Sequence, residues 1–305
     1  MKRKLSIQIN EYLDYCKDRK RLNAKTIKAY RIDLKQYCLT TSDETAFDIE
    51  GVDNYVTILH KHYKPKSIKR KIASLKAFFN YLGYKEILEV NPFDKLDLRF
   101  REPRLLPKII PFHVLQTFLS KLYQNMEQAT SRYQKNCCLR DIAVIELLFA
   151  TGIRISELCC LSSSDVDLNS QNILIFGKGA KERIIQIGNP DVIMSLTRYK
   201  NAFHDEITAT GHFFVNRLKD RLSEQSVRFM ILKYARQFGI DLHITPHMFR
   251  HSFATLLLEQ DVDIRYIQKM LGHSSINTTE IYTHVSSAKQ KDILVNKHPR
   301  NLMVV

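Results

Sequence analysis

The sequence of 305 residues has no apolar run long enough to cross a membrane as a helix. Such a helix needs roughly 18 or more consecutive apolar residues, and no stretch approaches that length. The N-terminal segment MKRKLSIQINEYLDYCK begins with basic residues, but it mixes charges into the part that a secretory signal would keep apolar. We therefore expect a cytoplasmic protein that does not associate with membranes.

The sequence also lacks the cysteine spacing of a zinc site or of a disulfide framework. It contains no C-x-x-C pair, and four of its six cysteines are adjacent in the chain. The six are Cys16, Cys38, Cys137, Cys138, Cys159 and Cys160. Buried thiols in a reducing compartment are the expected state. No internal repeat or low-complexity tract is present, and the length suggests two domains.

What the sequence has in excess is positive charge. Its formal net charge is +15 and its pI is near 9.5. A polyphosphate such as nucleic acid is the obvious partner for this charge, although a soluble basic protein without such a partner would have the same composition. The basic excess is shared almost evenly between the first 100 residues and the rest, as expected if both parts contact DNA.

The first 86 residues show the spacing of a helical bundle. Apolar residues recur every three or four positions in four separate stripes, and Gly83 follows the last stripe. The stripes are Ile9, Tyr12, Leu13 and Cys16; Ile27, Tyr30, Leu34 and Tyr37; Ile49, Val52, Val56 and Leu59; and Ile68, Ile72, Leu75, Phe79 and Leu82. The pattern predicts four amphipathic helices.

Two of these helices carry a strongly basic outward face. The residues that we predict to contact DNA are Lys25, Lys28 and Arg31 on the second helix, and Lys66, Lys69 and Arg70 on the fourth. Lys35, Lys64, Lys71 and Lys76 lie on the same predicted faces. A charged helix face is usually only a solvated face, but two neighbouring basic helices in a basic domain favour an interface with phosphates.

The segment 91–111 has a different composition. It contains four of the eight prolines and no helical period, and proline interrupts both helices and strand ladders. We expect a helical DNA-binding domain over residues 1–90, a linker over 91–111 and a second domain over 112–305.

The second domain has a mixed pattern. Leu115, Phe118, Leu119 and Leu122 predict one helix, and residues 139–151 predict a centrally buried helix that ends at Gly152. Two β-rich runs, 172–176 and 183–187, flank GKGAKE and predict a hairpin with a glycine-rich, basic tip. Further helices are expected over 227–238 and 264–271. The predicted fold class is therefore mainly α with a small β-hairpin or sheet.

Four short segments of this domain carry reactive side chains. They are ATGIRISEL with Arg154, GKGAKER with Lys178, HMFRH with His247 and Arg250, and LGHSSINTTEIYTH with His273 and Tyr282. Each is weak alone, because an arginine after a turn or a lysine in a hairpin loop is usually a surface residue. In the last segment, Asn277 and Glu280 have the spacing of a capping box that would begin a helix carrying Tyr282.

Together these side chains suit transesterification at a DNA phosphodiester. Two arginines offer planar donors to the nonbridging oxygens, and two histidines add donors or move protons near neutral pH. A lysine can protonate the leaving oxygen, and a tyrosine hydroxyl can attack the phosphorus and store the bond energy as a phosphotyrosine. Fixed positive charge would supply most of the stabilisation, so neither metal nor ATP is expected.

These motifs resemble the tyrosine recombinase (phage integrase) family, and most closely its Xer-like members. The family order of Arg, Lys, His-x-x-Arg, His and Tyr is filled throughout, and TGIRISEL, FGKGAKER, LGHSSINTTEIYTHV and HPR are Xer-like phrases. The resemblance covers essentially the whole chain. It implies a SAM-like core-binding bundle followed by a catalytic domain whose final residues, about 286–305, dock onto a neighbouring subunit.

The resemblance also implies a role for each residue. Arg154, Arg250 and His273 would hold the scissile phosphate, and Glu157 would support the first arginine. Lys178 would act as general acid, His247 would assist proton transfer, and Tyr282 would form a 3′-phosphotyrosine. The expected partner is double-stranded DNA with a specific core site, bound by a homotetramer or by a heterotetramer with a related recombinase. Because the chain begins with the core-binding bundle, we expect no arm-binding domain of the lambda-integrase kind.

Three alternatives remain open at this level. A type IB topoisomerase uses similar chemistry, but those enzymes resemble Lys-x-x-Arg where this chain has His247 and Arg250. A catalytically inactive DNA-binding protein would keep the basic charge. A zinc hydrolase could use His247 and His251, four residues apart, but HMFRH lacks the glutamate that general-base chemistry would need. The target sequence and the biological outcome of the reaction are not encoded in any of these motifs.

Overall fold

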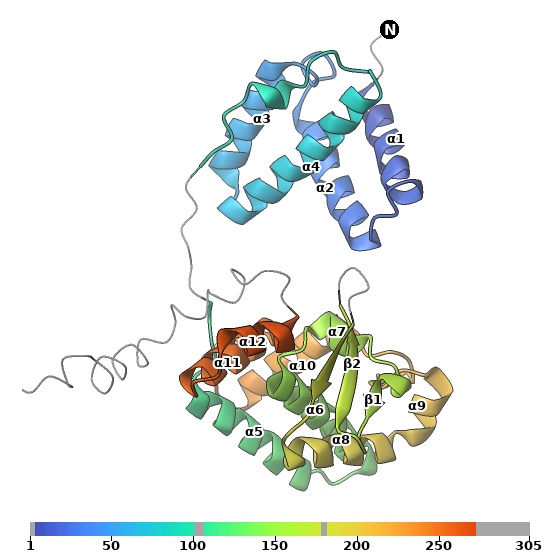
Figure 1. The fold of residues 1–305 in the computed structure, drawn as a ribbon, viewed down its shortest axis with the longest axis vertical. Coiled ribbons are helices and arrows are strands. Elements are labelled where there is room, and N and C mark those ends of the chain that lie inside the picture. The colour runs from blue at the N-terminus through green and yellow to red at the C-terminus, as the bar shows by residue number, and fades with distance from the viewer. Residues whose placement is uncertain (1–3, 101–106, 178–181, 273–305) are drawn as a thin grey trace, which may run out of the picture. The chain divides into compact units, whose positions relative to one another are not determined.

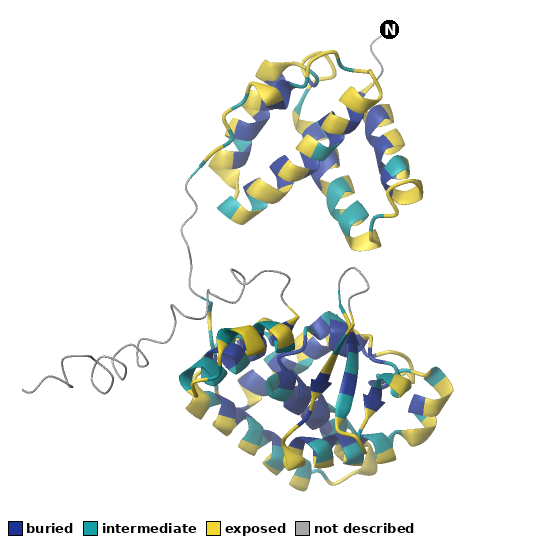
Figure 2. Ribbon diagram, in the orientation of Figure 1, coloured by how far each residue is buried: buried dark blue, intermediate teal, exposed yellow. Residues whose placement is uncertain are grey.

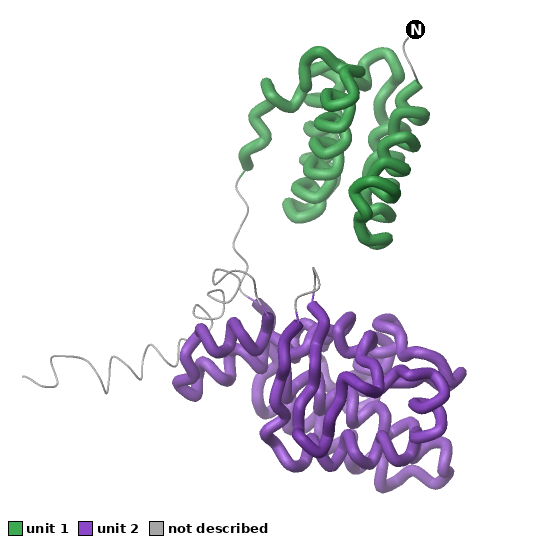
Figure 3. The backbone as a smooth tube through the Cα atoms, turned by 45° about the vertical axis from the view of Figure 1, so that its right-hand side comes forward, with its two compact units in different colours: residues 1–104 green, residues 105–305 purple. Residues whose placement is uncertain are grey.

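The computed structural model describes residues 4–100, 107–177 and 182–272. Contacts divide the chain into two compact units, residues 1–104 and 105–305, shown in Figure 3. The division falls inside the segment 91–111 that we predicted to be a linker. Within the described residues, no helix is long and apolar enough to cross a membrane.

Over residues 4–100, unit 1 is a bundle of four α-helices, as the four apolar stripes predict (Figure 1). The helices are α1 (Leu5–Asp18), α2 (Ala24–Thr40), α3 (Ile49–His62) and α4 (Pro65–Tyr84). Helix α2 starts where the side chain of Asn23 accepts a hydrogen bond from the backbone of Lys25, and α4 starts with a proline at its first position, where no N–H is required. Helix α4 continues through Gly83 to Tyr84, one residue beyond the predicted stop.

The core of unit 1 contains a buried charge network that the apolar pattern does not reveal. Lys71, predicted to face outward, is instead 3% exposed, and its Nζ donates to Asp33 Oδ1 at 3.1 Å. Asp33 is 0% exposed and also accepts from Ser74 Oγ at 2.9 Å and from the Arg70 guanidinium. A buried charge requires a partner of opposite sign. Because Asp33 lies on α2 and its partners lie on α4, the network holds these two helices together.

The chain after α4 packs back onto unit 1. A short 3₁₀ helix, η1 (Pro92–Asp94), buries Phe93 in the core of the bundle, and Leu96, Leu98 and Phe100 pack against that core. The first part of the predicted linker therefore lies against unit 1.

Unit 2 combines eight α-helices with a small sheet in its described part (Figure 1). The helices are α5 (Phe112–Glu127), α6 (Arg132–Thr151), α7 (Ile155–Cys159), α8 (Pro190–Ala202), α9 (His204–Thr210), α10 (Glu224–Gln237), α11 (Pro246–Glu259) and α12 (Ile264–Leu271), with a 3₁₀ turn, η2 (Ser163–Asp165), before the sheet. Helix α6 contacts α5, α8 and α11. Its central position confirms the prediction made from its apolar sequence, and Figure 2 shows it largely buried.

The sheet is antiparallel and contains the predicted hairpin. Strands β2 (Asn172–Phe176) and β3 (Glu182–Gln186) pair in register from Asn172 opposite Gln186 to Phe176 opposite Glu182. A third strand of two residues, β1 (Val166–Asp167), pairs with β2 and was not predicted. The segment between these two strands includes Lys178, which lies outside the described residues.

Candidate active site

Arg154 lies on a tight turn between α6 and α7. Gly152 ends α6 in the left-handed conformation, with φ of 59°, and Ile153 is buried. The backbone N–H of Arg154 donates to Glu157 Oε2 at 3.0 Å, and its Nη1 donates to Glu157 Oε1 at 2.8 Å. The side chain remains 33% exposed, so Glu157 fixes the guanidinium without burying it.

Arg250 is held more tightly than Arg154. It lies one turn into α11 and is 4% exposed. Its Nη1 donates to the carbonyl oxygen of Gly152 at 2.6 Å, and its Nη2 donates to that of Leu271 at 2.6 Å. Two bonds from different terminal nitrogens fix the plane of the guanidinium. Arg250 thereby joins α11, the turn before Arg154 and the end of α12.

Two histidines flank Arg250 on α11. The pKa of His247 is lowered, first by the protein atoms packed around its ring and then by the positive charges of Arg250, Arg228 and Arg154. Burial lowers the pKa of His251 to about 4, with further contributions from His247 and Arg250. Both rings are therefore neutral near pH 7. A neutral imidazole has a free ring nitrogen and can accept a proton.

Arg183 is a further charged residue at this site, and the sequence analysis did not assign it. It lies in β3, and its Nη1 and Nη2 donate to Glu157 Oε1 and Oε2 at 3.1 and 2.7 Å. Burial raises the pKa of Glu157, but the bonds and charge of Arg183, and then the bonds from Arg154, lower it overall. Its place in GKGAKER, five residues after Lys178, was the available signal.

Of the six predicted active-site residues, the structure describes Arg154, His247 and Arg250, and it places these three together. Lys178, His273 and Tyr282 lie outside the described residues. Lys178 follows β2 by two positions, and His273 immediately follows Gly272, the cap of α12. In Figure 1, α7, α12 and the ends of β2 and β3 that flank residues 178–181 lie on the same side of unit 2.

The six candidate DNA-contacting residues in unit 1 are all exposed, on two helices that contact each other. They are Lys25, Lys28 and Arg31 on α2, and Lys66, Lys69 and Arg70 on α4. Arg70 also pairs with the buried carboxylate of Asp33, so it has a structural role as well.

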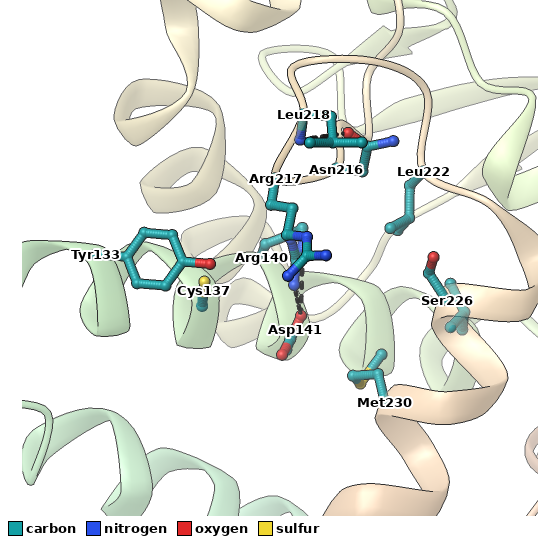
Figure 4. A pocket seen from close by; sticks show the side chains of 11 residues that line it. Tyr133, Cys137, Arg140, Asp141, Asn216, Arg217, Leu218, Leu222, Ser226 and Met230 are labelled. Atoms are coloured by element: carbon teal, nitrogen blue, oxygen red, sulfur yellow. Dashed lines mark hydrogen bonds and ion pairs between the residues drawn. The ribbon is translucent and has the colours of Figure 1, made fainter.

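Two further observations concern the described residues beyond this site. No group of three or more His, Cys, Asp or Glu side chains there could hold a metal ion. A cavity of about 320 Å³ lies between α6, the loop 216–222 and α10, and it is drawn in Figure 4. Arg140, one of its lining residues, pairs there with Asp141 at 2.7 Å. Its lining includes none of Arg154, His247 and Arg250.

Two protein-family models match the chain in chain order. The model described as phage integrase, N-terminal SAM-like domain matches residues 9–85, and the model described as phage integrase family matches residues 115–289. A tyrosine recombinase from Agathobacter rectalis is 58% identical over 298 residues, which cover 97% of each chain. The chain belongs to the phage integrase family.

Further comparisons show that the chain is similar to Xer recombinases. Tyrosine recombinase XerD from Staphylococcus haemolyticus is 34% identical, and the match covers 96% of this chain and 98% of that one. The crystal structure of the XerH site-specific recombinase bound to difH substrate has a TM-score of 0.71 at 21% identity, over 94% of this chain and 83% of that chain. This second likeness bears on the fold alone.

Membership in the family confirms the predicted resemblance. The chain is a tyrosine recombinase, an enzyme of site-specific DNA recombination. The predicted fold class is also confirmed, because unit 1 is the SAM-like helical bundle and unit 2 the mainly α catalytic domain with a small sheet.

Proposed function

We propose that this recombinase breaks one strand of duplex DNA at a specific core site by attack of the Tyr282 hydroxyl on the scissile phosphorus. The phosphodiester to the 5′ oxygen breaks, and the 3′ phosphate becomes joined to the tyrosine. The leaving 5′ oxygen takes a proton from Lys178 and becomes a 5′ hydroxyl. Attack by a 5′ hydroxyl from the other site then reverses these steps and restores the tyrosine.

Arg154, Arg250 and His273 would hold the nonbridging oxygens of that phosphate. Negative charge grows on these oxygens as the tyrosine attacks, and fixed donors stabilise it without reorganisation. His247, neutral near pH 7 because its pKa is lowered, would accept the tyrosine proton. Charge neutralisation by side chains and covalent storage of the bond energy together make a metal ion and ATP unnecessary.

The observation that best supports this proposal is the bond from Arg250 Nη1 to the carbonyl oxygen of Gly152, at 2.6 Å. Arg154 is the second residue after Gly152. This bond therefore holds Arg250 against the turn that carries Arg154, although the two arginines are 96 positions apart in the sequence. A solvated pair of surface arginines would repel each other. Two guanidinium groups held at one place on the protein suit a phosphate, which offers each of them an oxygen.

We further propose that the enzyme acts as a tetramer on two DNA sites, either a homotetramer or a heterotetramer with a related recombinase. The XerH structure contains difH substrate, and a related structure is a lambda integrase dimer bound to a COC′ core site. By likeness, the exposed basic residues on α2 and α4 would contact the DNA backbone. Residues 286–305 would dock onto the neighbouring subunit, and the enzyme would act in the cytoplasm.

Covalent trapping tests the proposal. A protected core site would first be located by footprinting genomic fragments, and a duplex nicked just beyond the scissile phosphate would then be incubated with the full chain. Cleavage releases a short fragment that diffuses away, so the adduct accumulates. We expect a denaturation-resistant protein–DNA band, formed equally in a chelator and without ATP. Absence of the band at a footprinted site would contradict the proposal.

A second assay separates recombination from simple relaxation. Supercoiled plasmid without the footprinted site should remain supercoiled, whereas plasmids with two copies should exchange strands. Relaxation that is independent of any site would favour the type IB topoisomerase alternative.

A further inference from the structure

Three consecutive carbonyl groups at the end of α12 accept hydrogen bonds from three different arginines. Met270 O accepts from Arg183 Nε at 3.1 Å, Leu271 O from Arg250 Nη2 at 2.6 Å, and Gly272 O from Arg154 Nη2 at 3.4 Å. The last carbonyls of a helix have no partner within the helix and carry partial negative charge. Two of the three arginines are proposed to hold the phosphate, and Arg183 has no role in that proposal.

Arg183 binds the same carboxylate that fixes Arg154. Its two terminal nitrogens donate to the two oxygens of Glu157 at 3.1 and 2.7 Å. Arg154 donates to the same oxygens through its backbone N–H and its Nη1. The carboxylate therefore lies between two guanidinium groups, and the paired geometry on the Arg183 side fixes its orientation.

The side chain of Arg183 also packs directly on the backbone of Gly272. A Cβ added to Gly272 would lie 3.0 Å from Arg183 Cδ and 3.0 Å from its Nη1, and the φ of this glycine is +64°. Only 13% of the Arg183 side chain is exposed. The chain continues from Gly272 directly into His273, and Arg183 follows Lys178 by five positions. One side chain thus contacts two segments that lead to proposed active-site residues, the turn of Arg154 and the end of α12, and it belongs to a third, the strand that follows Lys178.

We infer that Arg183 is a positioning residue for strand cleavage, which sets the geometry of Arg154 through Glu157 and holds the end of α12 against both. This inference rests on the proposed function. Arg183 touches Glu157, Met270 and Gly272 in the structure, and its effect on the phosphate passes through Glu157 and Arg154. Loss of the bidentate hydrogen bond from Arg183 to Glu157, with the positive charge kept, should misplace the Arg154 guanidinium.

Arg140 provides a matched control for a purely structural role. It is an arginine of the same unit whose side chain is 15% exposed, and it donates to Asp141 Oδ1 through Nε and Nη2 at 3.0 and 2.7 Å. Its pair with Asp141 lies beside the separate cavity of Figure 4. Arg140→Lys and Arg183→Lys both keep the charge and lose the planar donor set.

The test compares the full-length wild type, Arg183→Lys and Arg140→Lys in single-turnover cleavage of the nicked duplex at saturating protein. We expect Arg183→Lys to lower the cleavage rate constant by about 10- to 100-fold, as a misplacement of about 1 Å does. Its dissociation constant for intact duplex should stay within about threefold of wild type, and Arg140→Lys should cleave within about twofold of wild type.

Two further measurements distinguish positioning from loss of folding. Glu157→Gln should lower the cleavage rate to a similar extent. The double variant, Glu157→Gln with Arg183→Lys, should cleave only slightly more slowly than the slower single variant, because both substitutions disturb the same contact with Arg154. Cleavage by Arg183→Lys should also decline more steeply than that of wild type toward acid pH. The reason is that Arg183 holds the pKa of Glu157 down, and protonation of Glu157 removes its negative charge and turns one of the two oxygens that accept from Arg154 into a donor.

The outcomes separate this inference from the proposed function. If wild type forms no adduct, the proposed function fails. If wild type reacts and Arg183→Lys reacts at the same rate, the positioning role is wrong. Equal losses in Arg183→Lys and Arg140→Lys, or multiplied losses in the double variant, would also overturn it. If Arg183→Lys does not fold, the cleavage rate and pH profile of Glu157→Gln test the inference instead. Cleavage by Glu157→Gln at the wild-type rate would contradict it.

Discussion

Arg250 and Gly152 are joined by a hydrogen bond from the Arg250 Nη1 to the Gly152 carbonyl oxygen, at 2.6 Å. The donor lies in α11 and the acceptor in the turn after α6. A buried guanidinium and a buried carbonyl group both require a partner, so the bond couples the positions of two distant motifs. The geometry of the proposed phosphate site therefore depends on the backbone of this turn as much as on its arginines.

Gly152→Ala should strongly destabilise unit 2 and abolish cleavage. The backbone has φ of +59°, and an added Cβ would lie 2.7 Å from Phe253 Cδ1 and 2.8 Å from Leu271 Cδ2. The left-handed conformation costs an alanine about 1–2 kcal/mol, and overpacking a core adds about 1–3 kcal/mol. Urea unfolding followed by far-ultraviolet circular dichroism measures the loss.

Gly239→Ala is the control for this substitution. Gly239 also has a positive φ, of +68°, but nothing lies within 4 Å of an added Cβ. Gly239→Ala should therefore lose only the free energy that the left-handed backbone costs an alanine, and it should retain cleavage. Equal destabilisation by the two substitutions would mean that the contacts with Phe253 and Leu271 relax without cost.

Asp33→Ala should destabilise unit 1 by about 3 kcal/mol or more, because it leaves the buried ammonium of Lys71 without its carboxylate. Lys71 would keep its bond to Gln36 and the ring of Tyr63, 4.8 Å from its Nζ, which limits the loss. Replacing both charges, as in Asp33→Leu with Lys71→Met, should recover part of it. Urea unfolding is the measurement, and an unchanged midpoint for Asp33→Ala would contradict the network.

Asp97→Ala is the matched control for Asp33→Ala. Asp97 also pairs with an arginine of unit 1, Arg99, but the two side chains are 66% and 92% exposed. Exposed ion pairs contribute little to stability. The variant should therefore unfold at the same urea concentration as wild type.

His251 should make unit 2 sensitive to mild acid. Its pKa is lowered from an ordinary value of 6.5 to about 4, so between these values the unfolded chain binds a proton that the folded chain does not. Stability therefore falls as pH drops from 6.5 toward 4, and the effect is absent above 6.5. His251→Gln should reduce the difference between the urea midpoints at about pH 7.5 and about pH 5. An equal difference in variant and wild type would show that other groups cause it.

Substitution of Lys28 and Lys66 by glutamine should reduce the salt dependence of DNA binding. Each phosphate contact contributes about 0.9 to the slope of log K against log salt, so the loss of two should lower the slope by about 1.8. Fluorescence anisotropy with a labelled duplex measures it. Lys17 and Lys85 are exposed in the same unit but are not predicted contacts, and their joint substitution by glutamine is the control. Equal slopes for both double variants would contradict the assignment of the α2 and α4 faces.

Much of the fold follows from short-range patterns in the sequence. The four stripes of unit 1 and the apolar segment 139–151 of α6 form the predicted helices, because the spacing of apolar residues shows which face of a helix is buried. Helix α6 begins earlier than predicted, at Arg132, and its first turn is polar and exposed. Helix α12 also spans its predicted range, 264–271: it begins where Asp263 accepts from the backbone N–H of Arg265, and it ends where Gly272 adopts the left-handed conformation. The two-residue strand β1 was missed because so short a run has no period.

The misses at charged positions have a different cause. Lys71 lies beside the apolar stripe of α4, and only its contact with Asp33 on α2 explains its burial. In the sequence, Arg183 is one of several basic residues in the hairpin segment. Only the structure shows its contacts with Glu157 and Met270. Both depend on contacts between distant segments, which the period of a single helix or strand does not contain.

The central claim, that Tyr282 becomes joined to DNA, is tested most directly by mapping the trapped adduct. The wild-type adduct on the nicked duplex would be digested with protease and nuclease, and the peptide that carries the nucleotide identified by mass spectrometry. We predict a phosphodiester at Tyr282, and Tyr282→Phe should bind the same duplex with unchanged affinity and form no adduct. A nucleotide attached to another residue, or an adduct that persists in Tyr282→Phe, would contradict the account.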